Sequence, residues 1–220
     1  MSKRKVPVRA VPVVAAPVAE REARPPIEAI RAAAFSQFAE RGYPVVTVRD
    51  IMKACGLTQG ALYNHFKSKD ELLHDIIAST QAELERICLQ AVAGAGADPR
   101  AKLAAFVRAY VMRHCRLRVE ALVANREISW LDLEQVGDIR RSRRAIRDIL
   151  VGVLTEGQDN GLFDPPQVDG RRDLKAVAMA LLDQCTHISL WYVPGGRMTE
   201  EQMARLYADM ALRSVGAKVG

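Results

Sequence analysis

The sequence predicts an all-α protein of about nine helices. Over most of the chain, aliphatic residues recur every three or four positions, which is the spacing of one helix face. Prolines gather near the amino end, glycines stand mainly at the expected helix ends, and no run of alternating β-branched residues is present. Aromatic residues make up only 5% of the chain, so we expect a core of aliphatic side chains.

In the 220 residues we expect a tail and two helical domains, at residues 1–25, 26–73 and 74–220. The tail is rich in proline, valine and alanine without a helical period, which predicts disorder. It holds six basic and two acidic side chains, a net +4 of the chain's +6. Such a basic arm suits nucleic acid, although a solubilising leader would have the same composition.

The cysteines give no sign of a metal or disulfide site. They stand at positions 55, 88, 115 and 185, without a CxxC pair and without histidines at zinc spacing. We therefore expect small core residues in a reducing compartment, with no metal and no cofactor. No apolar run has the length of a membrane span, and prolines at 7, 12 and 17 interrupt any signal peptide. These features predict a cytoplasmic protein that does not associate with membranes.

The domain at 26–73 is expected to begin with a helix that ends at Gly42, followed by two short helices joined by a glycine turn. Thr47 can cap the first short helix, and Gly56 can take the positive φ of a sharp helix stop. Thr58 can cap the second, which would run to about Phe66. Three residues at helical spacing are expected to form the inner face of the first short helix: Ile51, Ala54 and Cys55. Two residues on the second face inward: Leu62 and Phe66.

The outward face of the second short helix is polar. It carries Thr58, Gln59, Gly60, Tyr63 and Asn64. In a helix-turn-helix, amide and hydroxyl groups at this place meet base edges and phosphates in the major groove. Gln59 and Asn64 can read a purine edge, Tyr63 reaches a phosphate, and Gly60 gives the backbone room to approach. The alternative is a three-helix cluster with a solvated polar face.

A third helix of this domain is expected to open at Ser68, which forms a capping box with Glu71. Lys69 then lies in the first turn, where the helix dipole disfavours a cation, and a nearby phosphate would explain its presence. The predicted DNA-binding residues are Thr47, Thr58, Gln59, Gly60, Leu62, Tyr63, Asn64 and Lys69.

Three motifs resemble the TetR/AcrR family over residues 27–77: FAERGY at 38–43, TVRDI at 47–51 and GLTQGALYNHFKSKDEL at 56–72. The resemblance implies a homodimeric transcription regulator, usually a repressor, that a small ligand in the C-terminal domain releases from its operator. It also places Thr47, Tyr63 and Lys69 at phosphate-contact positions.

The domain at 74–220 is expected to bind ligand and to dimerise. The helix from Ser68 continues unbroken almost to Gly94, long enough to belong to both domains. Asp98 and Pro99 form a strong helix start, and Thr199 can cap the last helix together with Gln202. The further helices are expected from 98 onward and at 119–130, 135–160, 173–192 and 199–215.

Two basic features are candidates for an anionic ligand. Arg126 and Trp130 recur on the same, mostly apolar side of a helix, where the guanidinium could bind a carboxylate or phosphate of a ligand. The alternative is that Arg126 pairs with Glu127 or Glu120 and that Trp130 fills the core. The arginines between 140 and 147 would ordinarily form a solvated face, but they could also bind phosphates of a ligand such as coenzyme A. The candidate pocket residues are His114, Arg126, Trp130, Arg144 and Thr186.

The last two helices are candidates for a homodimer interface. The helix at 173–192 is apolar over most of its circumference, and two such helix pairs could build a four-helix contact. The candidate interface residues are Leu181, Ile188, Trp191, Met203, Leu206 and Met210. The stretch at 191–202 resembles TetR-type regulators of fatty-acid, steroid or related acyl-thioester breakdown, which implies an acyl-CoA effector. In those regulators, arginines commonly flank the aromatic pair of this stretch. This sequence departs from that pattern and has Leu190 and Val193 at the two positions.

The sequence thus predicts a ligand-responsive regulator that binds a double-stranded operator. An effector-independent structural DNA-binding protein is the alternative. An enzyme is a weaker one, because the four histidines are scattered and neither an activated nucleophile nor a glycine-rich phosphate loop is present.

Overall fold

The computed structural model describes residues 26–217. In that range the chain forms nine α-helices and one 3-10 helix, and its only β-type pairing is an isolated bridge between Val168 and Arg171. The predicted all-α class is confirmed. The tail at 1–25, predicted to be disordered, lies outside the described residues. The chain divides into two compact units, the first ending at Leu73 and the second beginning at His74. No helix within 26–217 is long and apolar enough to cross a membrane.

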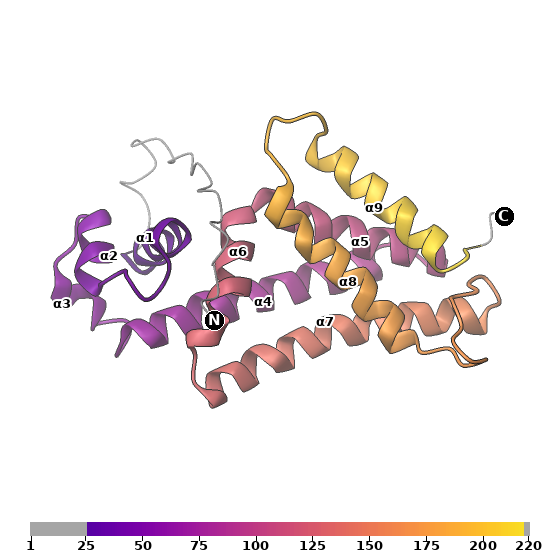
Figure 1. Cartoon of the computed structure of the whole chain (residues 1–220), viewed down its shortest axis with the longest axis horizontal. Helices are drawn as coiled ribbons and strands as arrows, with labels where there is room; N and C mark the ends of the chain where they lie inside the picture. The colour runs from indigo at the N-terminus through magenta and orange to yellow at the C-terminus, as the bar shows by residue number, and fades with distance from the viewer. Residues whose placement is uncertain (1–25, 218–220) are drawn as a thin grey trace, which may run out of the picture. The chain divides into compact units, whose positions relative to one another are not determined.

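Unit 1 contains α1 (Pro26–Arg41), α2 (Val48–Ala54), α3 (Gln59–Leu62) and the first turn of α4 (Lys69–Ala93) (Figure 1). α1 buries one side, formed by Ile30, Ala34 and Phe38 at intervals of four residues. It ends at Gly42, whose φ of 82° is favourable for glycine and costly for other residues. Gly56 has a φ of 71°, so the predicted glycine turn between α2 and α3 is confirmed.

The core of unit 1 departs from the prediction in two places. Met52 is buried on α2, whereas Ala54 is exposed and Cys55 only partly buried. Val46 is buried, but its neighbour Val45 is 59% exposed. On α2 the large side chains Ile51 and Met52 therefore take the inward positions, and the small side chain of Ala54 is left outside.

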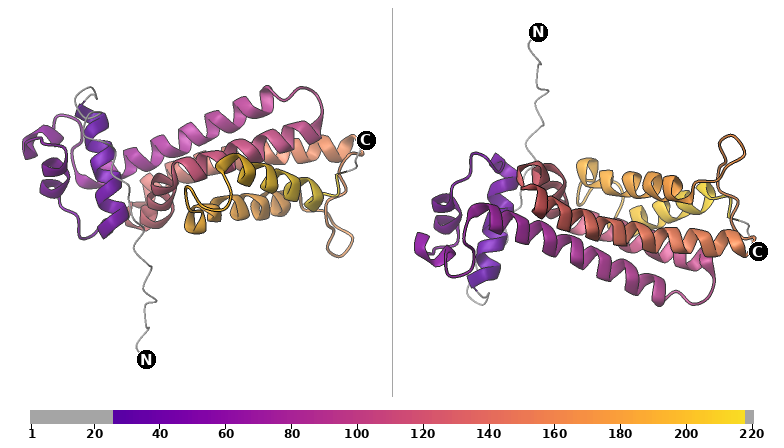
Figure 2. Two further views of the ribbon diagram at one scale, coloured as in Figure 1. Left: turned by 90° about the horizontal axis from the view of Figure 1, so that it is seen from above. Right: turned by 90° about the horizontal axis from the view of Figure 1, so that it is seen from below.

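Unit 2 contains the rest of α4, α5 (Pro99–Arg116), α6 (Arg118–Arg126), η2 (Glu127–Trp130), α7 (Leu133–Asp159), α8 (Leu174–Trp191) and α9 (Glu200–Ser214). α5 is the central helix and packs against α6, α7, α8 and α9 (Figure 1). Buried aromatic and aliphatic side chains fill the space between them, among them Phe106, Leu150, Ile188 and Met203. The loop between α7 and α8 projects beyond the helices of this unit (Figure 2).

Several helix ends in unit 2 form as predicted. Asp98 accepts a hydrogen bond from the backbone of Arg100 at the start of α5, and Thr199 forms a capping box with Gln202 at the start of α9. Gly161 ends α7 with a φ of 66°. The ring of Phe163 then folds back so closely that a Cβ added to Gly157 would lie 2.0 Å from it. Glycine at 157 is therefore required by packing.

All four cysteines lie within the described residues and are free thiols. Cys88, Cys115 and Cys185 are buried, and burial raises the pKa of Cys88 to about 12 and that of Cys115 to about 11. Cys55, next to the glycine turn of unit 1, is only partly buried. Among residues 26–217, no group of three or more His, Cys, Asp or Glu side chains is placed to hold a metal ion.

Candidate DNA-binding site and effector cavity

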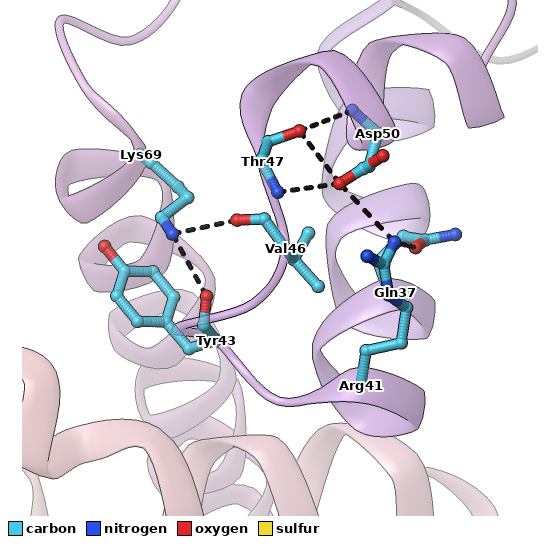
Figure 3. Close-up of polar contacts among 7 residues, drawn as sticks. All are labelled: Gln37, Arg41, Tyr43, Val46, Thr47, Asp50 and Lys69. Carbon is cyan, nitrogen blue, oxygen red and sulfur yellow. Dashed lines mark hydrogen bonds and ion pairs between the residues drawn. The ribbon is translucent and has the colours of Figure 1, made fainter.

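A capping box fixes the amino end of α2. The Thr47 hydroxyl accepts a hydrogen bond from the Asp50 backbone at 3.2 Å, and the Asp50 carboxylate accepts from the Thr47 backbone at 2.9 Å (Figure 3). These contacts lower the pKa of Asp50. Arg41 of α1 lies 3.4 Å from the same carboxylate. The Thr47 hydroxyl also donates to Asp50 at 2.8 Å, so its only donor is engaged within unit 1.

Lys69 contacts the segment that leads into α2. Its ammonium donates to the carbonyl oxygens of Val46 at 2.8 Å and Tyr43 at 3.0 Å, and it lies 4.1 Å from the centroid of the Tyr43 ring (Figure 3). The Tyr43 hydroxyl donates to Asp70 in the same turn of α4. Partners inside the protein therefore account for a lysine at this helix start, where the sequence had led us to expect a phosphate.

The residues expected to read DNA lie on the outside of unit 1. Gln59, Gly60, Tyr63 and Asn64 are exposed, Tyr63 to 59%. Nothing lies within 4 Å of a Cβ added to Gly60, so the fold itself does not require glycine there.

Three details of this region differ from the prediction. α3 is only four residues long, because i to i+3 bonds tighten the chain after Gly60, and Tyr63 and Asn64 lie in the turn that follows. Thr58 occupies the position before α3, but its side chain makes no capping hydrogen bond. Leu62, included among the DNA-binding residues, is fully buried. It holds α3 to the core and is not exposed for contact with DNA.

A small cavity lies between α4, α5 and α6 in unit 2. Its lining includes Thr80, Gln81, Leu84, Arg113, His114 and Asn125. The whole space, part of it open to solvent, is about 270 Å³, and its enclosed part has room for little more than a water molecule. Polar and charged side chains from three helices therefore surround one small interior space.

His114 is neutral in this cavity. Its Nδ1 lies 2.9 Å from the Tyr110 carbonyl oxygen, and its ring stacks on the Tyr110 ring with centroids 4.4 Å apart. Burial lowers the pKa of His114 to about 4. Because a carbonyl only accepts hydrogen bonds, Nδ1 carries the proton, and Nε2 is left as an acceptor.

Arg113 is the buried cation of the cavity. Its side chain is 10% exposed, and its Nη1 lies 3.2 Å from the Glu120 carboxylate. Its Nε is buried and has no hydrogen-bond partner within residues 26–217. Arg143 of α7 lies nearby and donates to the Asn125 side chain at 3.0 Å.

Two family models match this chain. One, described as bacterial regulatory proteins of the tetR family, matches residues 30–76. The other, described as a tetracyclin repressor-like C-terminal domain, matches residues 96–215, more than half of the chain. The chain belongs to the TetR family.

Relatives and solved structures agree with this assignment. The TetR-family chain is 31% identical over 190 residues to the HTH-type transcriptional repressor KstR2 of Rhodococcus jostii, covering 81% of this chain and 85% of the relative. The structure of the ketosteroid transcriptional regulator KstR2 of Mycobacterium tuberculosis has a TM-score of 0.78 at 25% identity, covering 90% of this chain and 98% of that one. The structure of AibR in complex with isovaleryl coenzyme A and operator DNA has a TM-score of 0.74 at 25% identity, covering 87% of this chain and 99% of that one. This TetR-family chain is a transcriptional regulator and not an enzyme.

The predicted pocket residues of this TetR-family chain are not brought together. His114 lines the cavity, and the Thr186 hydroxyl is one contact away, 2.8 Å from that of Tyr110. The other three candidates lie outside the cavity lining: Arg126, Trp130 and Arg144.

Those three residues occupy other surroundings. Arg126 pairs with Glu127 at 2.6 Å, as one alternative predicted. Trp130 is 53% exposed, so the expectation that it fills core is wrong, because η2 turns the chain away from a continuous helical stripe. Arg144 is exposed and donates to the Arg140 carbonyl oxygen.

Sequence reasoning missed Arg113, Gln81 and Asn125 as cavity residues. Arg113 follows the buried Tyr110 by three positions, which is the spacing of one helix face. A charged residue on an otherwise buried face was the signal that could have identified it. Nothing comparable marks Gln81 and Asn125, whose position depends on how α4 and α6 pack.

Half of the predicted dimer-interface residues are core residues of the TetR-family chain itself. Leu181, Ile188 and Met203 are at most 5% exposed, because the inner sides of α8 and α9 face α5. They are not available to a partner. Trp191, Leu206 and Met210 are 54%, 40% and 42% exposed. Three apolar residues not predicted for the interface are also exposed on α8 or just after it: Met179, Leu190 and Val193.

Proposed function

We propose that this TetR-family regulator is a homodimeric, effector-released repressor that binds a near-palindromic operator in the cytoplasm. The observation that carries the proposal is the exposed set Gln59, Gly60, Tyr63 and Asn64, held on a unit whose α2 is capped by Thr47. Two such units would enter successive major grooves, about 34 Å apart or a multiple of that distance. The repressor names of the KstR2 relatives support the direction of regulation.

The exposed apolar residues of α8 and α9 support the homodimer. Trp191, Leu206 and Met210 are large and each is at least 40% exposed. Exposed apolar side chains gathered on neighbouring elements mark protein contacts, and a twofold contact covers both copies with the same residues. Two helix pairs would then form a four-helix interface.

Effector binding is proposed for the cavity between α4, α5 and α6. The effector class would be a hydrophobic acid or its coenzyme A thioester, as supported by the AibR complex with isovaleryl coenzyme A. Because the enclosed part of the cavity is so small, a ligand must separate the helices that line it. α4 is one of them and begins at Lys69 in unit 1, so its displacement would change the spacing of the two reading units. Repression would then be lifted.

The experiment is a footprint on the DNA upstream of the gene, followed by a ligand screen. We expect protection of a symmetric site by a dimer, with an affinity that falls as salt rises. The purified protein is then screened by thermal shift against acyl-CoA thioesters, free acids, aromatics and cationic drugs, and each hit is tested for operator release. Hits confined to hydrophobic cations would contradict the acid or thioester class. Unselective protection that no compound reverses would favour an effector-independent DNA-binding protein instead.

A further inference from the structure

Arg113 has an incomplete set of partners for a buried guanidinium. One nitrogen, Nη1, meets Glu120 at 3.2 Å, while Nε is buried without a partner in the described part of the chain. Arginine binds carboxylates best through two parallel N–H groups on one edge. The edge that includes Nε belongs to a residue that lines the cavity. A carboxylate entering there would satisfy a donor that Glu120 leaves unused.

Glu120 is a weak competitor for this guanidinium. Its contact is a single one at the long end of the hydrogen-bond range, and its side chain is 29% exposed. Burial raises the pKa of Glu120, so its charged form is less favourable here than in water. If another anion takes its place, the carboxylate has solvent close at hand.

The charge of the cavity limits the kind of anion that fits. Arg113 is the one cation among the residues that line the cavity, and the neutral His114 adds no second charge. Arg143 lies just outside the lining, where its guanidinium donates to the Ala124 carbonyl oxygen and the Asn125 side chain. A single carboxylate balances one guanidinium, whereas a phosphate dianion would leave a buried charge uncompensated. Leu84, Ala121 and Ala124 supply apolar lining beside Arg113 for the first carbons of a chain.

We propose that Arg113 binds the carboxylate of a free hydrophobic acid, which replaces Glu120 as the partner of the guanidinium. The proposal rests on the effector-binding role proposed above for unit 2, and it selects the free acid over the thioester. It also gives the ligand a structural effect, because the ion pair that it breaks joins α5 to α6. Binding of the acid therefore replaces an ion pair between two helices with an ion pair between Arg113 and the ligand.

The test is isothermal titration of the full-length protein with sodium octanoate, 1-octanol and octanoyl-CoA. We expect octanoate to bind more tightly than the other two. Arg113→Gln should raise the Kd for octanoate at least about tenfold, the loss of one charge-assisted pair. Glu120→Gln should lower it by about threefold or more, because the competing carboxylate is gone. Arg108→Gln, which removes an exposed arginine from the same helix, is the matched control and should leave the Kd unchanged.

Equal binding of octanol and octanoate would overturn the proposal, and so would an unchanged Kd in Arg113→Gln. Circular dichroism establishes that each variant is folded. If Arg113→Gln does not fold, Glu120→Gln decides, since unchanged or weaker binding of octanoate contradicts the exchange. Operator release separates this inference from the function on which it rests. If octanoyl-CoA releases the operator while octanoate does not bind, only the carboxylate site is wrong. Arg113-dependent binding of octanoate without operator release would contradict the repressor mechanism alone.

Discussion

The ammonium of Lys69 lies 2.8 Å from the carbonyl oxygen of Val46, so the first turn of α4 holds the segment that enters α2. The same ammonium contacts the carbonyl and the ring of Tyr43. Two of its three N–H groups are thereby used inside unit 1. Lys69 thus positions the residues that would meet DNA, and this role can be separated experimentally from direct contact with a phosphate.

Lys69→Met should lower operator affinity through loss of structure rather than loss of a phosphate contact. Two carbonyl groups lose a charged donor, so we expect the free energy of unfolding to fall by about 1–2 kcal/mol. The slope of log K against log salt should stay the same, whereas loss of one phosphate contact would reduce it by about 0.9. Lys67→Met, at an exposed neighbouring lysine, is the control for lost charge. A reduced slope with unchanged stability would show that Lys69 contacts phosphate.

Gly60→Ala should separate folding from DNA binding. A Cβ at this position meets no protein atom within 4 Å, so stability should be unchanged or slightly higher, by up to about 1 kcal/mol. Operator affinity should fall about tenfold, because the methyl group occupies space that DNA would fill. Gly56→Ala is the contrasting control, because its φ of 71° makes alanine destabilising whether or not DNA is present. Full operator binding by Gly60→Ala would place the DNA contact elsewhere.

Gln59→Ala and Tyr63→Phe should weaken DNA binding in different ways. Gln59 can pair with a base edge, so its loss should relax preference at particular base pairs, with about 1–3 kcal/mol of discrimination lost there. Tyr63 offers a hydroxyl suited to a phosphate, and its loss should weaken binding similarly for all sequences. Binding to a set of single-base operator variants measures both effects. The assignment of the reading face is wrong if neither substitution changes the binding profile.

His114 should make the protein less stable in acid. Its pKa is about 4 in the folded protein and 6.5 in an unfolded chain, so the unfolded state takes up the proton first as pH falls. The contribution of His114 to stability is therefore constant above pH 6.5 and decreases between 6.5 and 4, by about 3 kcal/mol at most. Urea unfolding across this range should show a smaller decrease for His114→Gln. The exposed His187 provides the control His187→Gln, which should keep the wild-type profile.

Gly157→Ala should destabilise unit 2, because the new Cβ would lie 2.0 Å from the ring of Phe163. Overpacking of this kind costs about 1–3 kcal/mol. Replacing the ring relieves the clash, so Gly157→Ala should cost less in a Phe163→Leu background than in the wild type. A double-mutant cycle of thermal unfolding measures this coupling. Additive effects would mean that the two positions do not interact in solution.

Local chemistry made much of the fold predictable. Helix ends depend on contacts between residues no more than three positions apart, and the structure has the predicted ones. Helices start after Thr47, Asp98 and Thr199, and one ends before Gly56. The shortness of α3 was not predictable in this way. Its spacing allows a helix as far as Phe66, and only the packed unit shows that the chain leaves the helix at Leu62.

The same distinction between local and distant contacts explains which site residues could be predicted. Exposure of Gln59 and Tyr63 follows from the position of Leu62 on the opposite side, so periodicity was enough. The partners of Lys69 are 23 and 26 residues away, and those of Arg113 depend on the packing of α5 against α6. A phosphate was therefore expected at Lys69, and Arg113 was overlooked. For α8 and α9, periodicity identified apolar faces but not which of them faces α5.

The uneven burial of the four thiols has a practical consequence. Cys88, Cys115 and Cys185 are enclosed, while Cys55 is partly accessible beside the turn that precedes α3. A maleimide dye should therefore attach first at Cys55 in the native protein. A fluorophore there would sit a few residues from Gln59, where its emission can report operator binding and release without any engineered label site.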